Sequence, residues 1–176
     1  MMVHVRREQM ERDYADSNID FDPRREGVPA GWGNRRRSTF MVMPVSYLLY
    51  TGLPALRKGA ATAGRSAPPS LVAHVLIAIT TDRQSAMAAG HQLIDMYTRY
   101  LFYVKMFTSA GFPTTVGGAA PDGLVASLVI SGDENMVTAR FSELLASGLD
   151  ELMVTLLPIR DADDEQFRLL HSVGRL

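Results

Sequence analysis

Histidine is the side chain of this 176-residue chain best suited to acid–base or metal chemistry near neutral pH, and the chain has four. His4, His91 and His171 are far apart in the sequence, which gives a metal site little support. His74 lies inside an apolar run, where a hydrogen-bonded core histidine is expected more often than a ligand or a base. It could also point into the lumen of a barrel, and the sequence leaves this open.

Two glycine-containing stretches partly match nucleotide-binding motifs. Gly59 and Gly64 have the glycine spacing of a P-loop, but Arg65 stands where the motif has lysine. These glycines also fall within and at the end of a predicted helix, and not between a strand and a helix. Gly31 and Gly33 lack the third glycine and the preceding strand of a dinucleotide-binding motif. Neither stretch therefore indicates phosphate binding.

Residues 131–134 (SGDE) could present the amino end of a helix to an anion. Asp133 and Glu134 already place negative charge there, so a structural role is favoured. We predict a capping box with Ser131 as the N-cap and Glu134 at the third helical position. The commonest hydrolase motifs, Gly-x-Ser-x-Gly and His-Glu-x-x-His, do not occur in the sequence.

The composition argues against several classes of partner. The formal net charge is -1 with a pI near 6.4, which gives no reason to expect a nucleic-acid partner, and residues 35–37 (RRR) form only a short basic run. No apolar run reaches the roughly 18 residues that span a bilayer, so we expect no membrane partner. The absence of cysteine excludes a disulfide scaffold and fits a reducing compartment. We expect a cytoplasmic protein.

The apolar pattern predicts alternating strands and helices from residue 39 onward. Buried strands are predicted at 39–44, 71–79 and 152–157, and helices at about 47–60, 82–107, from 131 and at 161–173. Pro54 must start or kink the first helix, while Gly64 and Gly148 are expected to end helices. Residues 111–122 are expected to form a loop. This order calls for parallel strands with right-handed crossovers, an α/β fold.

Residues 1–38 differ from the rest of the chain. They are rich in Arg, Asp and Glu and show no sustained apolar period, so we expect them to be poorly structured or loosely packed. An aromatic stripe within the predicted 82–107 helix is expected in the core, although a neighbouring subunit could cover it, which makes a homo-oligomer a possible partner. The stripe comprises Tyr97, Tyr100, Tyr103 and Phe107.

Several segments, taken in order and spacing, resemble luciferase-like monooxygenases and in particular their deazaflavin-dependent members. They are residues 43–57 (MPVSYLLYTGLPALR), 59–69 (GAATAGRSAPP), 73–78 (AHVLIA), 110–113 (AGFP), 128–134 (LVISGDE) and 146–154 (ASGLDELMV). The resemblance covers most of residues 41–176 and corresponds to the C-terminal part of that family. It implies a partial (β/α)8 TIM barrel over residues 39–176, with only the C-terminal strands and helices.

The resemblance stops before residue 39. The family has a segment like Ala-Gly-Glu-Ile-Ala-Asp-Gly there, whereas this chain has residues 31–37 (GWGNRRR). Plausible codons for residues 32–38, read one base out of step, encode Gly-Glu-Ile-Ala-Asp-Gly-Ala. Our hypothesis is that residues 1–38 are a frame-shifted segment and that the gene or its ancestor was longer.

The resemblance implies an oxidoreductase that passes a hydride between a reduced deazaflavin (coenzyme F-420), or FMN, and a small organic substrate. Met43, Pro44 and Tyr47, just past the first predicted strand, are the candidates for the cofactor pocket, because active sites of this fold gather on strand-to-helix loops. The sequence supplies no candidate catalytic residue and no metal ligands. The fragment is expected to be inactive. The alternatives are a non-catalytic α/β remnant and a small binding or oligomerisation module.

Overall fold

The computed structural model describes residues 2–6, 37–40 and 42–174. Its strands are β1 (Met2–Arg6), β2 (Arg37–Phe40), β3 (Ser70–Ala78), β4 (Val129–Ser131) and β5 (Glu151–Leu156). Its helices are α1 (Val45–Tyr47), the π-helical turn η2 (Leu48–Gly52), α2 (Leu53–Thr62), α3 (Arg83–Tyr97), α4 (Leu101–Ser109), α5 (Asp122–Leu128), α6 (Glu134–Ala146) and α7 (Ala162–Val173). None of the helices in these ranges combines the length and apolar character needed to cross a membrane.

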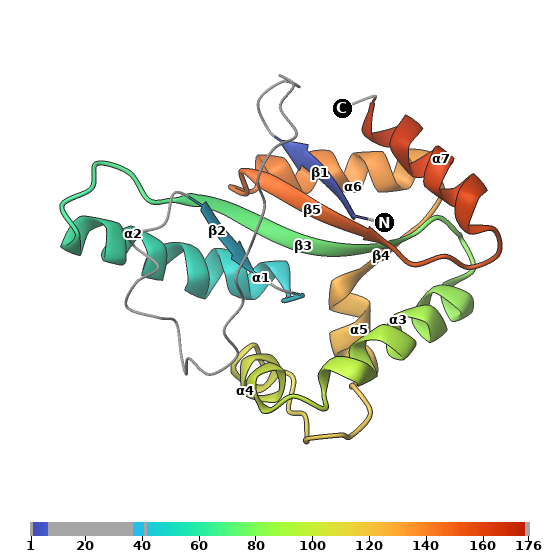
Figure 1. The fold of residues 1–176 in the computed structure, drawn as a ribbon, viewed down its shortest axis with the longest axis horizontal. Coiled ribbons are helices and arrows are strands. Elements are labelled where there is room, and N and C mark those ends of the chain that lie inside the picture. Colours follow the sequence, from blue (N-terminus) through green and yellow to red (C-terminus); the bar gives the residue numbers. More distant parts are fainter. Residues whose placement is uncertain (1, 7–36, 41, 175–176) are drawn as a thin grey trace.

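β3 is the central strand of the sheet (Figure 1), with β5 along one edge and both β2 and β4 along the other. All three neighbours run parallel to β3. The predicted parallel arrangement of strands near Thr39, Leu71 and Leu152, each followed by a helix, is therefore confirmed. The architecture is α/β, as the sequence indicated.

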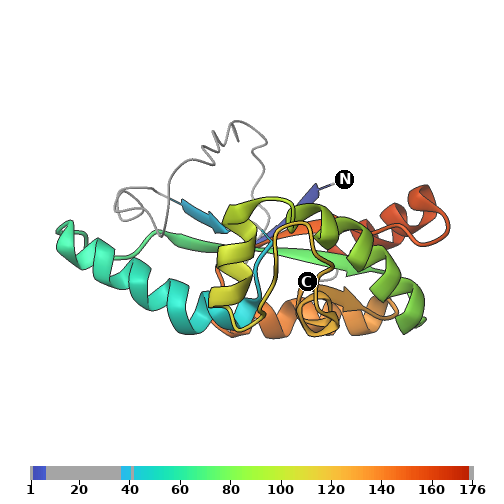
Figure 2. The ribbon, with the colours of Figure 1, turned by 90° about the horizontal axis from the view of Figure 1, so that it is seen from below.

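Alternating side chains of β3 and β5 place two apolar layers on opposite faces of the sheet, because successive residues of a strand point to opposite sides. One face packs against α1, α2 and α6, which lie together along one side of the sheet in Figure 2. The buried strand residues of this core include Leu71, Ala73, Val75, Ile77, Leu152, Val154 and Leu156. Burial of each large aliphatic side chain contributes about 1.5–3 kcal/mol, so this layer supplies much of the folding free energy.

A second core lies beside β4, where α3, α4 and α5 are gathered (Figure 1). It takes Leu76 and Ala78 from the other face of β3, and its largest fully buried side chain is Phe107 of α4. Gly90 of α3 allows the close approach of this layer, because a Cβ there would lie 2.6 Å from Val125 Cγ1 and 2.8 Å from Val129 Cγ2. The absence of a side chain at this position is therefore a packing requirement.

Several local predictions are confirmed. Gly64 and Gly148 follow the last residues of α2 and α6 with φ angles of 67° and 115°, the left-handed conformation expected of a glycine that ends a helix. Pro54 lies in the first turn of α2, directly after the π-helical turn η2. The structure therefore places the proline in a first helical turn, where its missing backbone N–H is tolerated.

The predicted single helix over residues 82–107 is wrong. The chain leaves the helix after Tyr97, and Tyr100 is extended (φ -106°, ψ 120°) before α4 begins. The hydroxyl of Thr98 is 2.9 Å from the Asp95 carbonyl oxygen and 2.6 Å from the Gly118 carbonyl oxygen. These contacts tie the break to the following loop, a tertiary interaction that apolar periodicity does not reveal.

The predicted capping box is also wrong. Ser131 belongs to β4 and is paired with Ala78, while the N-cap of α6 is Asp133, whose side chain accepts from Met136 N. The strand pairing of Ser131 holds its backbone extended, so the helix starts two residues later than a capping box would require. Sequence analysis also missed α5 and β4, which are too short to show a clear period.

The expectation for residues 1–38 is wrong for β1. Met2–Arg6 pairs antiparallel with β5, and Val5 is buried in the core on the helix-covered face. β2 begins at Arg37, two residues before the predicted strand. Residues 7–36, and with them most of the proposed frame-shifted segment, lie outside the described residues.

Candidate functional site

His74 lies in the middle of β3, on the face opposite α1, α2 and α6. Its neighbours Ala73 and Val75 point into the helix-covered core, so the alternation of the strand places His74 on the other face. Only 7% of this residue is exposed. The same face of β3 carries Leu76 and Ala78, which pack against α3, α4 and α5 in the second core. The structure thus places His74 on the face opposite α1, α2 and α6, and its position in a barrel lumen stays a prediction.

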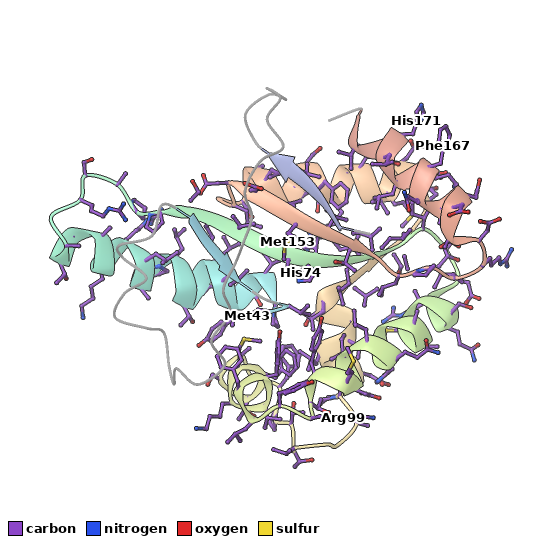
Figure 3. All side chains as sticks on the ribbon, viewed as in Figure 1. Met43, His74, Arg99, Met153, Phe167 and His171 are labelled. Atoms are coloured by element: carbon purple, nitrogen blue, oxygen red, sulfur yellow. The ribbon has the colours of Figure 1, made fainter. Side chains whose placement is uncertain are left out.

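A polar partner of His74 comes from β5. His74 Nε2 and Thr155 Oγ1 are 2.8 Å apart, and either atom can donate, depending on the imidazole tautomer. Met153 is the register partner of His74 and is also buried; Figure 3 shows the two residues side by side in the centre of the sheet. An imidazole held in this way can offer or accept a proton on a mostly apolar surface.

Thr155 was missed by sequence analysis. It is the polar residue within the apolar run at 152–157 (LMVTLL), and that pattern could have drawn attention to it. A buried hydroxyl is expected to have a hydrogen-bond partner, so a lone threonine in a parallel strand points to a polar group on an adjacent strand. Which strand supplies that group cannot be read from the sequence.

A pocket of about 230 Å³ opens at a gap in the sheet, and we call it the gap pocket. Pairing of β3 with β2 ends at Ala73 and pairing with β4 starts at Leu76, which leaves His74 and Val75 between the two neighbours. The walls come from the segment entering α1, from β3, from α5 and β4, and from α6. The lining residues are Met43, Val45, Ser46, His74, Val75, Ala126, Ser127, Leu128, Ile130, Arg140 and Leu144.

The three predicted pocket residues lie close together in and just before α1. Met43 is 6% exposed and lines the gap pocket together with His74. Pro44 is buried and its carbonyl oxygen accepts from Leu48 N at 3.2 Å, while Tyr47 is half-buried against the core. The structure thus brings Met43 into a pocket wall and gives Pro44 and Tyr47 packing roles. Their part in binding a cofactor stays a prediction.

The strand-to-helix connections carry a set of aspartates that cap the following helices. Asp82, Asp133 and Asp161 accept hydrogen bonds from backbone amides in the first turns of α3, α6 and α7. The Ser85 hydroxyl, 2.6 Å from Asp82 Oδ2, is the main cause that holds the pKa of Asp82 below its usual value. These carboxylates satisfy the helix amides, so they explain local structure and not anion binding.

His91 has two close carboxylate neighbours. Its Nε2 is 2.9 Å from Asp122 Oδ1, and its Nδ1 is 3.6 Å from Asp95 Oδ1. Asp95 also accepts from Ala120 N at 2.7 Å, so the cluster ties α3 to the start of α5. No group of three or more ligand side chains suited to a metal ion occurs within residues 2–6, 37–40 and 42–174.

No protein-family model and no curated protein matches the chain. Among solved structures, the chain is similar to an F420-dependent secondary alcohol dehydrogenase in complex with an F420-acetone adduct. The TM-score is 0.59 at 12% sequence identity, and the match covers 78% of this chain and 43% of that chain. The chain has a partial TIM-barrel-like fold. It spans less than half the length of the protein that it matches.

Proposed function

We propose that this chain forms part of a deazaflavin-dependent oxidoreductase barrel and lacks turnover by itself. The reaction of the complete barrel is the transfer of a hydride between a reduced deazaflavin and an organic substrate, with FMN as the alternative cofactor. The observation that carries the proposal is the similarity in fold to an F420-dependent dehydrogenase. A substrate with a secondary alcohol or ketone group is the first candidate, because that protein was captured with an F420-acetone adduct.

The position of the His74–Thr155 pair supports the same proposal. The pair lies on the sheet face opposite α1, α2 and α6, and we infer that this face lines the lumen of the complete barrel, because the helices of a TIM barrel lie outside its sheet. His74 would there offer a polar group on a surface otherwise made by Met153 and Val72. In such enzymes the cofactor supplies the hydride chemistry, while the protein binds it, orients it and keeps water away.

The described residues do not fit a whole deazaflavin or FMN. Cofactor pockets measure about 300–1,000 Å³ and enclose most of the ligand, whereas the gap pocket measures about 230 Å³. The gap pocket also lies largely on the helix-covered side, away from the lumen face. Further walls are required to enclose a cofactor there. We therefore derive no catalytic step and assign no catalytic residue.

The test is a titration of the purified chain with F420 and with FMN, followed by NMR and by a turnover assay with propan-2-ol. We expect weak binding that shifts the resonances of His74, Met153 and Thr155, and no measurable reduction of F420. Micromolar affinity with turnover would show that the chain is competent alone. Unchanged resonances at these residues would contradict the proposal that this face of the sheet binds a deazaflavin.

A non-catalytic α/β module that associates with itself is the second candidate. It is favoured by large apolar side chains exposed on α7, where Phe167 is 69% and Leu170 is 45% exposed. Figure 3 shows Phe167 and His171 on the outer side of that helix. Light scattering after size exclusion tests this candidate: a dimer that dissociates in Phe167→Ser supports a homo-oligomer, and a monomer at all concentrations argues against it.

A further inference from the structure

We propose that the gap pocket binds a small organic anion, namely a carboxylate carried on a compact apolar body. The inference does not rest on the proposed function, because the pocket is enclosed by α1, α5, β4 and α6 on the helix-covered side of the sheet. It follows from three properties of the lining: an apolar floor, a cationic rim and the absence of acidic side chains among the lining residues.

The floor of the gap pocket is apolar and buried. Met43 is 6% exposed, Leu128 is 4% exposed, and Val75 and Leu144 are each 3% exposed. They come from four separate parts of the chain, so the floor exists only in the folded protein. An apolar group placed on this floor gains about 25 cal/mol for each Å² that it removes from water.

The rim provides a positive charge that faces no acidic group of the lining. Arg140 and His74 are the two lining residues that can carry charge: the guanidinium of Arg140 is always cationic, and an imidazole is either neutral or cationic. Arg140 forms an ion pair with Glu143 at 2.8 Å, but the side chains are 51% and 64% exposed. Such an exposed ion pair contributes little to the free energy of folding. Guanidinium has five N–H donors, so Arg140 can bind a second carboxylate while it keeps Glu143.

The two serines of the lining, Ser46 and Ser127, carry no charge and therefore do not replace Arg140. The hydroxyl of Ser127 donates to the Leu124 carbonyl oxygen at 2.7 Å, so only its lone pairs face a ligand. Lone pairs do not bind a carboxylate, which accepts hydrogen bonds and cannot donate them. Preference for an anion over a neutral molecule of the same shape therefore depends on Arg140. A benzoate-sized ligand suits the volume of about 230 Å³.

The experiment compares benzoate with benzamide, its neutral analogue, by ¹H–¹⁵N NMR titration of the full chain. We expect benzoate to shift the amide signals of Val75, Ile130 and Leu144 with a millimolar Kd. Benzamide should bind at least about tenfold more weakly, because it lacks the charge-assisted hydrogen bonds to Arg140. In Arg140→Gln the affinity for benzoate should fall to that for benzamide.

Two further variants make the result specific to the pocket. Arg99→Gln removes the same charge from an exposed residue between α3 and α4 that does not line the pocket, and it should bind benzoate like the parent chain. Ala126→Leu adds bulk to the pocket wall and should weaken both ligands. All these positions are exposed, so the variants should fold, and their NMR spectra report it directly. Benzoate that fails to saturate, shifts other residues, or binds Arg140→Gln unchanged would overturn the proposal.

Discussion

His74 of β3 and Thr155 of β5 are joined across the sheet by a 2.8 Å contact between Nε2 and Oγ1. The two residues are not register partners: His74 is opposite Met153, and Thr155 is opposite Leu76. The contact is therefore diagonal, between side chains on the same face of neighbouring parallel strands. It helps to fix the direction of the buried imidazole, and so bears on the chemistry available on this face.

Thr155→Val tests this relationship because valine keeps the shape of threonine and removes the hydroxyl. The buried imidazole then loses its bond to Oγ1, and loss of a partner by a buried polar group costs about 1–3 kcal/mol. We expect urea unfolding to show a lower midpoint with an unchanged slope. Thr62→Val is the matched control, because its hydroxyl bonds the Lys58 carbonyl oxygen at an exposed position. A change within about 0.5 kcal/mol is expected there. Equal losses at both positions would contradict the prediction.

The main strands could be predicted to within a residue or two because their sequence pattern is simple. β3 was predicted at 71–79 and spans Ser70–Ala78, and β5 was predicted at 152–157 and spans Glu151–Leu156. Strands buried on both faces are nearly continuous apolar runs bounded by polar residues or proline, and both runs have this form. The helix ends at Gly64 and Gly148 were predictable because left-handed backbone strongly favours glycine.

The features that were not predicted correctly depend on contacts between residues far apart in the sequence. The break before α4 is tied by Thr98 to the Gly118 carbonyl oxygen, twenty residues later. β1 is a strand because β5 offers it a free edge, although its own sequence is short and mixed. The face of His74 was likewise undecidable, since it depends on which side of the sheet the helices cover. The gap pocket combines segments more than 90 residues apart, and no local sequence pattern predicts such a site.

Gly90→Ala should destabilise the protein despite the better helix propensity of alanine. An added Cβ would lie 2.6 Å from Val125 Cγ1 and 2.8 Å from Val129 Cγ2, well inside contact distance. Overpacking of this kind costs about 1–3 kcal/mol, against a gain of about 1 kcal/mol from replacing glycine in a helix. Thermal unfolding should therefore show a lower midpoint for the variant.

Gly123→Ala is the control for this prediction. Gly123 is also helical, but the nearest atom to an added Cβ is Phe112 Cε1 at 3.6 Å, an ordinary contact. Its midpoint should stay the same or rise, because only the propensity gain remains. If Gly90→Ala were as stable as Gly123→Ala, α3 would not be held against α5 and β4 as the structure has it.

Asp82→Asn tests the acid dependence of stability. The Ser85 hydroxyl and backbone amides of α3 lower the pKa of the Asp82 carboxyl in the folded state. A lowered folded pKa means that this stabilisation is present above the unfolded pKa of about 3.9 and is lost as the pH falls through the folded pKa. Asparagine still caps the helix but does not titrate. The variant should therefore lose less stability than the parent chain between about pH 5 and pH 3 in urea unfolding; parallel curves would contradict this role.

Tyr103→Phe should stabilise the protein. Tyr103 is 4% exposed, and its hydroxyl has no hydrogen-bond partner within the part of the chain that the structure describes. Its ring is stacked on Tyr97 with 4.6 Å between centroids, a contact that phenylalanine retains. Removing a buried, unsatisfied hydroxyl should raise the unfolding free energy by about 1 kcal/mol or more. Tyr100→Phe, at a residue that is 58% exposed, should leave it nearly unchanged.

The same variant should change the response to alkaline pH. Burial, with smaller contributions from Tyr97 and Tyr100, raises the pKa of Tyr103 in the folded state above the ordinary value of 10. The unfolded chain then releases this proton near pH 10, whereas the folded chain retains it. Stability is therefore fully present below pH 10 and falls as the pH rises toward the folded pKa. Since phenylalanine has no proton to release, the advantage of Tyr103→Phe over the parent chain should widen between about pH 9 and pH 11. A constant difference in urea midpoints over that interval would mean that the hydroxyl has access to water.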